Sequence, residues 1–199
     1  MKIQNKLPKS NENLHKALLD KGWVLIKEPQ NMNMAAFLSI PFMIINALIS
    51  IEVINIFSGI SLEEFGFKEG TLTITVNWGI FIFLFFLVIF HEILHLILIP
   101  NFLKSEKTFI GLTWFGGFVV TEEEIVKSRY ILITIAPFVI ISIILPIMLG
   151  GLGLLTPILK MLILLNAVSS SVDILIFLLI LKQVPNNVIN KKQLKYGAI

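Results

Sequence analysis

Four long apolar stretches divide the chain, and shorter polar segments separate them. They cover approximately residues 34–60, 76–102, 129–149 and 155–181. Each reaches or exceeds the roughly 20 residues that an α-helix needs to cross the hydrocarbon core of a bilayer. Pro41 lies inside the first stretch and predicts a kink or a restart there. The pattern predicts an all-α membrane protein with about four transmembrane helices.

The segment between the second and third helices, residues 103–128, has a pattern of its own. β-Branched and aromatic residues on both sides of Gly116-Gly117 are typical of two short strands joined by a tight turn. The aromatic side chains of this segment suit the interface between membrane and water. The pattern predicts a small cytosolic β-hairpin at 108–121.

The basic residues predict the orientation of the helices, because short cytosolic loops collect Lys and Arg. Six of the 16 precede the first helix, four lie in or beside the 103–128 loop, and four follow the last helix. The opposite side has only Lys68 and Lys160, and Lys160 is expected to extend outward along the membrane. We therefore expect a multi-pass protein of the cell membrane with both termini cytosolic. Its parts are an arm (1–33), a four-helix transmembrane domain (34–181) and a tail (182–199).

Composition narrows the chemistry further. Hydrophobic residues make up 56% of the chain and charged residues only 15%, which leaves no room for a separate soluble catalytic domain. The absence of cysteine excludes disulfides and thiolate metal ligands. The net charge of +3 comes from residues beside the membrane ends, with no accompanying aromatic–basic surface. We expect the bilayer, and no nucleic acid, as a partner.

The second apolar stretch contains the motif His91-Glu92-Ile93-Leu94-His95. From Trp78 to Pro100 these two histidines and this glutamate are the only ionisable side chains. Each ionisable group in hydrocarbon costs about 2.5–3.5 kcal/mol on insertion scales. A chance motif, or histidines that bond backbone carbonyls, is the alternative, and the apolar surroundings disfavour it.

The spacing of the motif indicates metal binding. Residues four apart lie on one face of a helix, so His91 and His95 can reach the same ion. Glu92 points about 100° away from His91, where it can touch a water on that ion without being a ligand. This is the arrangement of zinc hydrolases, with two His ligands, a carboxylate base and an open position.

A catalytic zinc ion needs a third protein ligand. The candidates are Asp173, the cluster Glu122–Glu124, Glu106 and Glu52. His95 and Asp173 both lie roughly 10–14 Å below the cytosolic end of their predicted helices, at 1.5 Å per residue. Glu52 lies near the opposite face, and the loop glutamates lie in or near water. Depth therefore favours Asp173 as the third ligand. The alternatives are that the glutamate cluster supplies this ligand, or that Asp173 has a purely structural role.

Two other polar features lie in the fourth helix. Asn166 precedes Asp173 by seven residues and so shares its helical face, about 10 Å deeper. Its amide suits either a substrate carbonyl or oxyanion, or a hydrogen bond between helices, and the sequence leaves both open. The run Ser169-Ser170-Ser171 favours close packing of the fourth helix on the second.

The HEILH motif, together with an Asn and an Asp seven residues apart in a later helix, resembles the site-2 protease class of intramembrane zinc metalloproteases. Over roughly residues 15–185 the chain is more similar to a prokaryotic family of small membrane proteins described as putative zincin peptidases, which shares Lys21-Gly22-Trp23 and Ala136-Pro137-Phe138. The resemblance implies His91, His95 and Asp173 as zinc ligands, Glu92 as base and Asn166 as a polar helper. The site-2 class has prolines between its Asn and Asp, whereas here Ala-Val-Ser-Ser-Ser-Val intervenes.

These patterns predict a zinc-dependent peptidase that cleaves a membrane-protein or membrane-peptide substrate at or within the membrane, near the cytosolic face. A helical substrate hides its carbonyls, so it must unwind, and the 108–121 hairpin offers a strand for it to pair with. A non-catalytic zinc-binding scaffold or metal-handling protein is the alternative, and it would need the three ligands but not Glu92. A metal-free polar network is a third.

Overall fold

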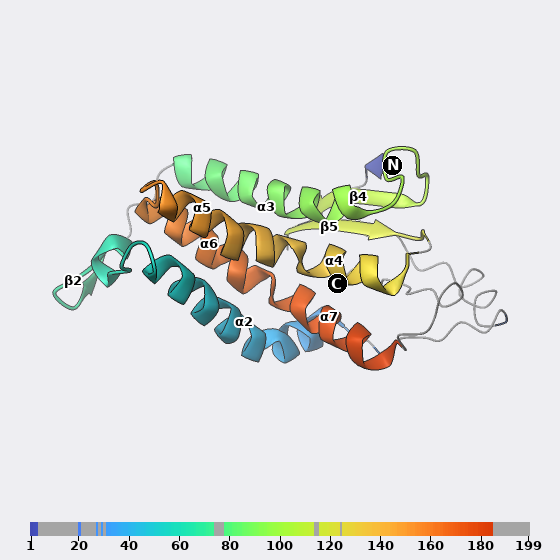
Figure 1. The fold of residues 1–199 in the computed structure, drawn as a ribbon, viewed down its shortest axis with the longest axis horizontal. Helices are drawn as coiled ribbons and strands as arrows, with labels where there is room; N and C mark the ends of the chain where they lie inside the picture. The colour runs from blue at the N-terminus through green and yellow to red at the C-terminus, as the bar shows by residue number, and fades with distance from the viewer. Residues whose placement is uncertain are drawn as a thin grey trace.

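The computed structural model contains four helical spans and a small β-sheet (Figure 1). All four spans are long and apolar enough to cross a membrane, as the sequence predicts, and are compatible with a multi-pass membrane protein. They run over Asn33–Asn55, Trp78–Leu98, Lys127–Gly151 and Pro157–Gln183. The structure describes residues 1–3, 20, 27, 29, 31–73, 78–113, 116–123 and 125–184. Most of the predicted arm and of the predicted tail lies outside the described residues.

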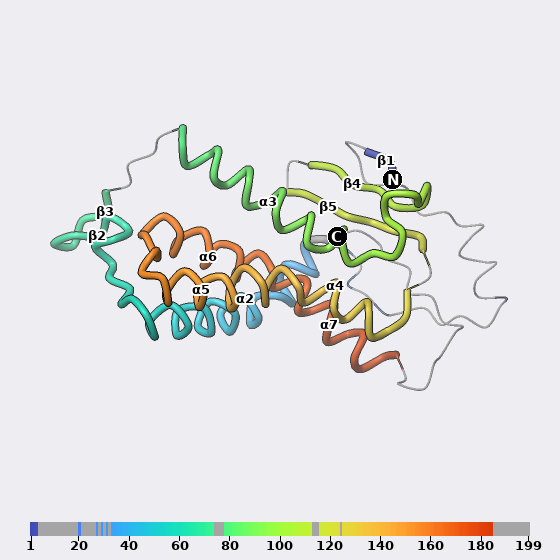
Figure 2. Tube along the Cα trace, turned by 45° about the horizontal axis from the view of Figure 1, so that its top comes forward, coloured from blue at the N-terminus to red at the C-terminus, as the bar shows by residue number. Residues whose placement is uncertain are grey.

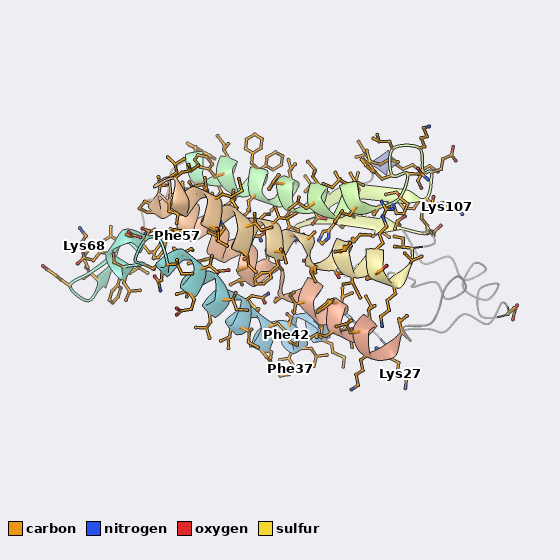
Figure 3. The ribbon with its side chains drawn as sticks, viewed as in Figure 1. Lys27, Phe37, Phe42, Phe57, Lys68 and Lys107 are labelled. Atoms are coloured by element: carbon orange, nitrogen blue, oxygen red, sulfur yellow. The ribbon has the colours of Figure 1, made fainter. Side chains whose placement is uncertain are left out.

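The first span is helix α2, Met32–Asn55. Asn31 caps it, because its side chain accepts a hydrogen bond from the Met34 N–H at 2.9 Å. The helix continues through Pro41 without a restart and ends five residues earlier than predicted. Phe37 is largely exposed on its outer face, as expected for a helix that faces lipid (Figure 3).

The connection from the first to the second span is more ordered than the polar loop that the sequence indicates. It forms a 3₁₀ turn, η1, Leu62–Phe65, and a two-stranded ribbon of β2, Phe67–Lys68, and β3, Thr71–Leu72. Glu64 of the turn pairs with Lys160 of the fourth span, with the Lys160 Nζ 2.9 Å from the Glu64 Oε2. Lys160 is only 1% exposed. The Lys160 amine thus reaches the loop at its own end of the span, as expected, but it ends on the Glu64 carboxylate and not in water.

The second span is helix α3, Trp78–Leu98. The third and fourth spans lie between α3 and α2 in two views of the molecule (Figures 1 and 2). The outer face of α3 carries exposed aromatic and aliphatic side chains, among them Phe81, Phe85 and Phe86. Its inner face packs against the third span, the fourth span and the sheet.

The third span changes its helix type between two prolines. Helix α4, Lys127–Pro137, leads into a π-helical stretch, η2, Phe138–Ile144, and then into α5, Leu145–Gly151. Pro137 and Pro146 lack the backbone N–H that a regular helix would use at those positions. The wide turns of the π-helix therefore lie where the regular α-helical hydrogen bonding is interrupted.

The fourth span is two helices, α6, Pro157–Ser169, and α7, Ser171–Gln183. The prediction of one continuous helix is wrong at Ser170, whose φ of −68° and ψ of 2° leave the helical range. Serine competes for backbone hydrogen bonds, and the Ser169 Oγ donates to the Asn166 carbonyl at 3.0 Å. Both halves pack mainly along α2. The fourth span therefore packs more on the first span than on the second. That the serines bring it close to the second span stays a prediction.

A β-hairpin lies between the second and third spans, as the sequence predicts, but the expected turn residues Gly116 and Gly117 are instead the first two residues of its second strand and pair with the first. Strand β4, Thr108–Thr113, pairs antiparallel with β5, Gly116–Thr121, and the turn between them lies outside the described residues. Strand β1, Lys2–Ile3, adds in parallel to the other edge of β4, so the sheet order is β1-β4-β5. Strand β5 packs on α3.

A small apolar core joins the hairpin-side ends of the spans. It contains Ile99, which follows α3, Tyr130 and Ile133 of α4, and Ile180 of α7. This core holds α3, α4 and α7 together close to the histidines of α3, and thereby positions the candidate site.

Candidate metal centre

Two spans bring His91, His95 and Asp173 together. The two Nε2 atoms of the histidines lie 3.3 Å apart. The Asp173 Oδ2 lies 3.3 Å from the His91 Nε2, and the Asp173 Oδ1 lies 3.5 Å from the His95 Nε2. The three side chains are 13–19% exposed. Of the candidate carboxylates that the structure describes, Asp173 is the one that the fold places beside both histidines.

The break at Ser170 places Asp173 near the start of a new helix. Because a new helix begins at Ser171, Asp173 lies in the first turn of α7. The first turn of a helix favours a negative charge, since its free N–H groups carry partial positive charge. The carboxylate therefore has a stabilising setting within an apolar span before any metal is considered.

The separations fit a tetrahedral zinc site. Zinc binds His nitrogen and carboxylate oxygen at about 2.0–2.2 Å, and ligands at tetrahedral angles then lie about 3.3–3.6 Å from one another. The two Nε2 atoms lie 3.3 Å apart, and each lies within 3.3–3.5 Å of one oxygen of the Asp173 carboxylate, Oδ2 for His91 and Oδ1 for His95. One ligand atom from each of the three residues lies within 4.8 Å of the other two, close enough for one ion. A donor set of two imidazoles and one carboxylate is also the set that catalytic zinc uses, with one position left for water.

Each histidine ring makes a hydrogen bond through its Nδ1 atom, while its Nε2 atom faces Asp173. The His95 Nδ1 lies 2.8 Å from the carbonyl oxygen of Ile133. A carbonyl only accepts hydrogen bonds, so Nδ1 carries a hydrogen, and in the neutral ring Nε2 then keeps its lone pair. The His91 Nδ1 lies 2.9 Å from the Asn166 Oδ1 and donates to it in the same way. Both rings thus turn a free Nε2 towards Asp173, which is the orientation a metal ligand needs.

Asn166 is fully buried and uses each polar atom of its side chain. Its Nδ2 donates to the Pro137 carbonyl at 3.1 Å and to the Ser142 Oγ at 2.9 Å, while its Oδ1 accepts from His91. Of the two roles that the sequence leaves open, this arrangement favours the hydrogen bond between helices. Asn166 then supports the metal centre by orienting His91, and has no atom left for a substrate.

Glu92 lies against the hairpin, beside the cluster but outside the group of three ligand atoms. A Cβ placed on Gly117 of β5 would lie 2.4 Å from the Glu92 Cγ and 3.0 Å from its Oε1. Only a residue without a side chain allows so close an approach. The hairpin therefore forms one wall of the site next to the expected base, a contact that sequence reasoning missed.

The other acidic candidates do not join the cluster. The Glu123 Oε1 accepts a hydrogen bond of 2.6 Å from the Ser105 Oγ near the start of the hairpin. Glu52 and Glu106 are exposed, and Glu124 lies outside the described residues. Within the described part of the chain, no glutamate belongs to the metal-binding group.

Fold and site together define a class, namely a helical protein with four membrane-length spans that carries a zincin-type donor set inside two of them. Comparison with known families agrees with this class. Residues 84–189, just over half of the chain, match a family described as "Putative zincin peptidase", and the match includes all three clustered residues. The chain belongs to this family, whose description implies a zinc metallopeptidase. No curated protein and no solved structure gives a significant match.

Proposed function

We propose that the protein is a zinc-dependent peptidase that cleaves a membrane-protein or membrane-peptide substrate at or within the membrane, near its cytosolic face. The observation that carries this proposal is the donor set itself. Two Nε2 atoms and a carboxylate converge at the separations of zinc ligands inside apolar spans, with Glu92 adjacent. The family supports the same chemistry.

His91, His95 and Asp173 would hold the ion. Zinc supplies Lewis acidity, which makes water a better nucleophile and polarises a carbonyl. Glu92, next in sequence to a ligand, accepts a proton from the attacking water and returns it to the leaving amine. Asn166 and the Ile133 carbonyl keep the two rings in place during this exchange.

The depth of the site suits a substrate that enters from the membrane surface. Helix α3 ends at Leu98, four residues earlier than predicted, so His95 lies about 4–5 Å from this end along the helix axis and not the roughly 10–14 Å predicted. The hairpin β4–β5 lies beside this end of α3 (Figure 2). A segment that has left the bilayer core or unwound near its end could reach the site without crossing the full span.

The sheet offers such a segment a place to bind. Strand β1 covers the far edge of β4, so β5 is an edge strand of the described sheet. Gly117 of β5 touches Glu92. We propose that an unwound substrate pairs with β5 as a further strand, which would present its carbonyls beside Glu92.

The orientation proposed for the protein places the hairpin on the cytosolic side. Lys27 and Lys107 lie at one end of the molecule and Lys68 lies at the other (Figure 3). The chain has no cysteine, so single cysteines at positions 68 and 107 can be introduced for labelling in intact cells. An impermeant thiol reagent should label position 68 and not position 107. The reverse pattern would invert the topology.

Glu92→Gln tests the catalytic part of the proposal. The amide keeps the size of the side chain but cannot accept the proton, so cleavage should fall by about 10²–10⁴-fold. Zinc content should stay at that of wild type, because Glu92 contributes no ligand. The assay follows cleavage of a panel of single-span substrates in proteoliposomes, with Glu52→Gln as a matched control on the exposed face of α2. Cleavage by Glu92→Gln at the wild-type rate would exclude Glu92 as base, and zinc-loaded wild type without any cleavage would favour the scaffold.

A further inference from the structure

Backbone carbonyls of the third span accept hydrogen bonds from side chains of other spans. The Pro137 carbonyl accepts from the Asn166 Nδ2 at 3.1 Å, and the Ser142 carbonyl accepts from the Ser50 Oγ at 3.3 Å. The Ile133 carbonyl accepts from the His95 Nδ1 at 2.8 Å, and it lies four residues before Pro137. For Ile133 the cause lies in helix geometry.

In an α-helix the carbonyl of residue i accepts from the N–H of residue i+4. Proline has no N–H, so the carbonyl four residues earlier loses its helical donor. The next N–H along the chain does not replace it, because the Phe138 N–H bonds to the Ile135 carbonyl. The Ile133 carbonyl is therefore available to a donor from outside the helix.

Ile133 is part of the small apolar core, where water cannot supply that donor. A buried carbonyl without a donor is unfavourable, so the nearest donor is drawn to it. The nearest donor is the His95 ring, and the bond fixes both the rotation of the ring and the nitrogen that carries hydrogen. The other nitrogen, Nε2, then faces His91 and Asp173.

We propose that Pro137 is a positioning residue of the metal centre, acting through the carbonyl that its missing N–H leaves free. The inference rests on the proposed function in one respect, that the cluster binds zinc. Pro137 touches neither metal nor substrate in this account. Because Pro137 cannot donate a hydrogen bond within its own helix, the Ile133 carbonyl is free to orient the His95 ring.

Pro146 provides a matched control within the same span. It follows the π-helical stretch, in which the Leu145 N–H bonds to the Ile140 carbonyl five residues earlier, so the four-residue rule does not identify the carbonyl that Pro146 leaves free. The Ser142 carbonyl nearby accepts from Ser50 and not from a residue of the cluster. Pro137→Ala and Pro146→Ala each add one backbone N–H to the third span, and only the N–H at position 137 lies four residues after the acceptor of a clustered histidine.

The experiment measures zinc affinity of the purified full-length chain by competition with a chromogenic chelator. Pro137→Ala should bind zinc about 10–100-fold more weakly, the usual loss when the partner of a ligating histidine is removed. Pro146→Ala should stay within about threefold of wild type. Lactic acid in place of Pro137, which lacks both the ring and the N–H, should restore the affinity. Wild-type affinity in Pro137→Ala, or equal losses in both proline variants, would overturn the proposal.

A second measurement does not depend on metal. The chain has three histidines, so a sample with ¹⁵N-labelled histidine gives a simple spectrum in which His95 is identified by its loss in His95→Gln. The Nδ1–H proton of His95 should exchange slowly with water in wild type and Pro146→Ala, and faster in Pro137→Ala. Unchanged exchange in Pro137→Ala would refute the inference. If wild type bound no zinc, the proposed function would fail, and this exchange measurement would still decide the role of Pro137.

Discussion

Within the described part of the chain, two groups of ionisable side chains are largely buried, and their partners differ in kind. The amine of Lys160 donates to both oxygens of Glu64, at 3.0 and 2.9 Å, and to the Gly59 carbonyl at 2.8 Å. Its three hydrogens therefore meet three acceptors. The hydrogen bonds of the Lys160 amine are therefore all satisfied within the protein, and the ion pair joins the loop after α2 to the fourth span.

The cluster at the other end of the bundle is arranged in the opposite way. The Nδ1 atoms of His91 and His95 donate outward, so the two Nε2 atoms and the Asp173 carboxylate all turn acceptors towards one another. In neutral rings these acceptors converge without a donor between them, and a cation bound among them would satisfy them. The comparison distinguishes a structural ion pair, in which donors match acceptors, from the cluster that we propose as a zinc site, in which neutral rings leave the acceptors unmatched.

Asp173→Ala should have the largest effect, because it removes the one carboxylate from the convergent acceptors. We expect zinc content after dialysis to fall from about one ion per chain to less than about a tenth, and cleavage to become undetectable. Metal analysis of purified protein measures this. Lys160→Met should keep its zinc, since Lys160 belongs to the group that is already complete. Zinc retained in Asp173→Ala would move the third ligand elsewhere.

Gly117→Ala should have the next largest effect, confined to catalysis. The new Cβ would lie 2.4 Å from the Glu92 Cγ, so Glu92 must move. Displacement of a catalytic group by about 1 Å can cost about 100-fold in rate, while zinc content should not change. A cleavage assay and metal analysis on the same sample separate the two outcomes.

The control for this substitution is Gly151→Ala, because no atom lies within 4 Å of a Cβ at Gly151. Gly117→Ala should also destabilise wild type more than it destabilises Glu92→Ala, in which the obstructing Cγ is gone. Equal thermal shifts in both backgrounds would contradict the proposed contact.

Lys160→Met should have the smallest effect, and only on stability. Removing one partner of a fully buried pair costs about 3–5 kcal/mol. The side chain of Glu64 is 28% exposed and regains some hydration, so we expect on the order of 2 kcal/mol. Adding Glu64→Gln should recover part of the loss. Thermal unfolding in detergent measures both variants. A loss of zinc or of activity in either variant would show that the ion pair and the histidine–aspartate cluster depend on each other.

The sequence was sufficient for the features that depend on local periodicity and length. Four apolar stretches of membrane length identify the spans, because no other element satisfies its backbone within hydrocarbon. The four-residue spacing of His91 and His95 places both rings on one helical face whatever the rest of the chain does. The pairing of the two strands was likewise predictable, since they are adjacent in the chain, but the turn was placed too late, because Gly116 and Gly117 belong to the second strand.

The remaining features join residues that are far apart in the chain. Asp173 was favoured from depth alone, but its contact with both histidines depends on the break at Ser170 and on the packing of α7. The partners of Lys160, His95 and Glu92 are distant in sequence. Glu64 lies 96 residues from Lys160, Ile133 lies 38 residues from His95, and Gly117 belongs to a different element from Glu92, so no local signal marks them. Sequence shows that Pro137 lacks an N–H, but only the tertiary structure decides which donor takes the carbonyl it frees. The physical reason is that a hydrogen bond between spans depends on how the helices are placed in space, and that placement is set by the packing of the whole bundle.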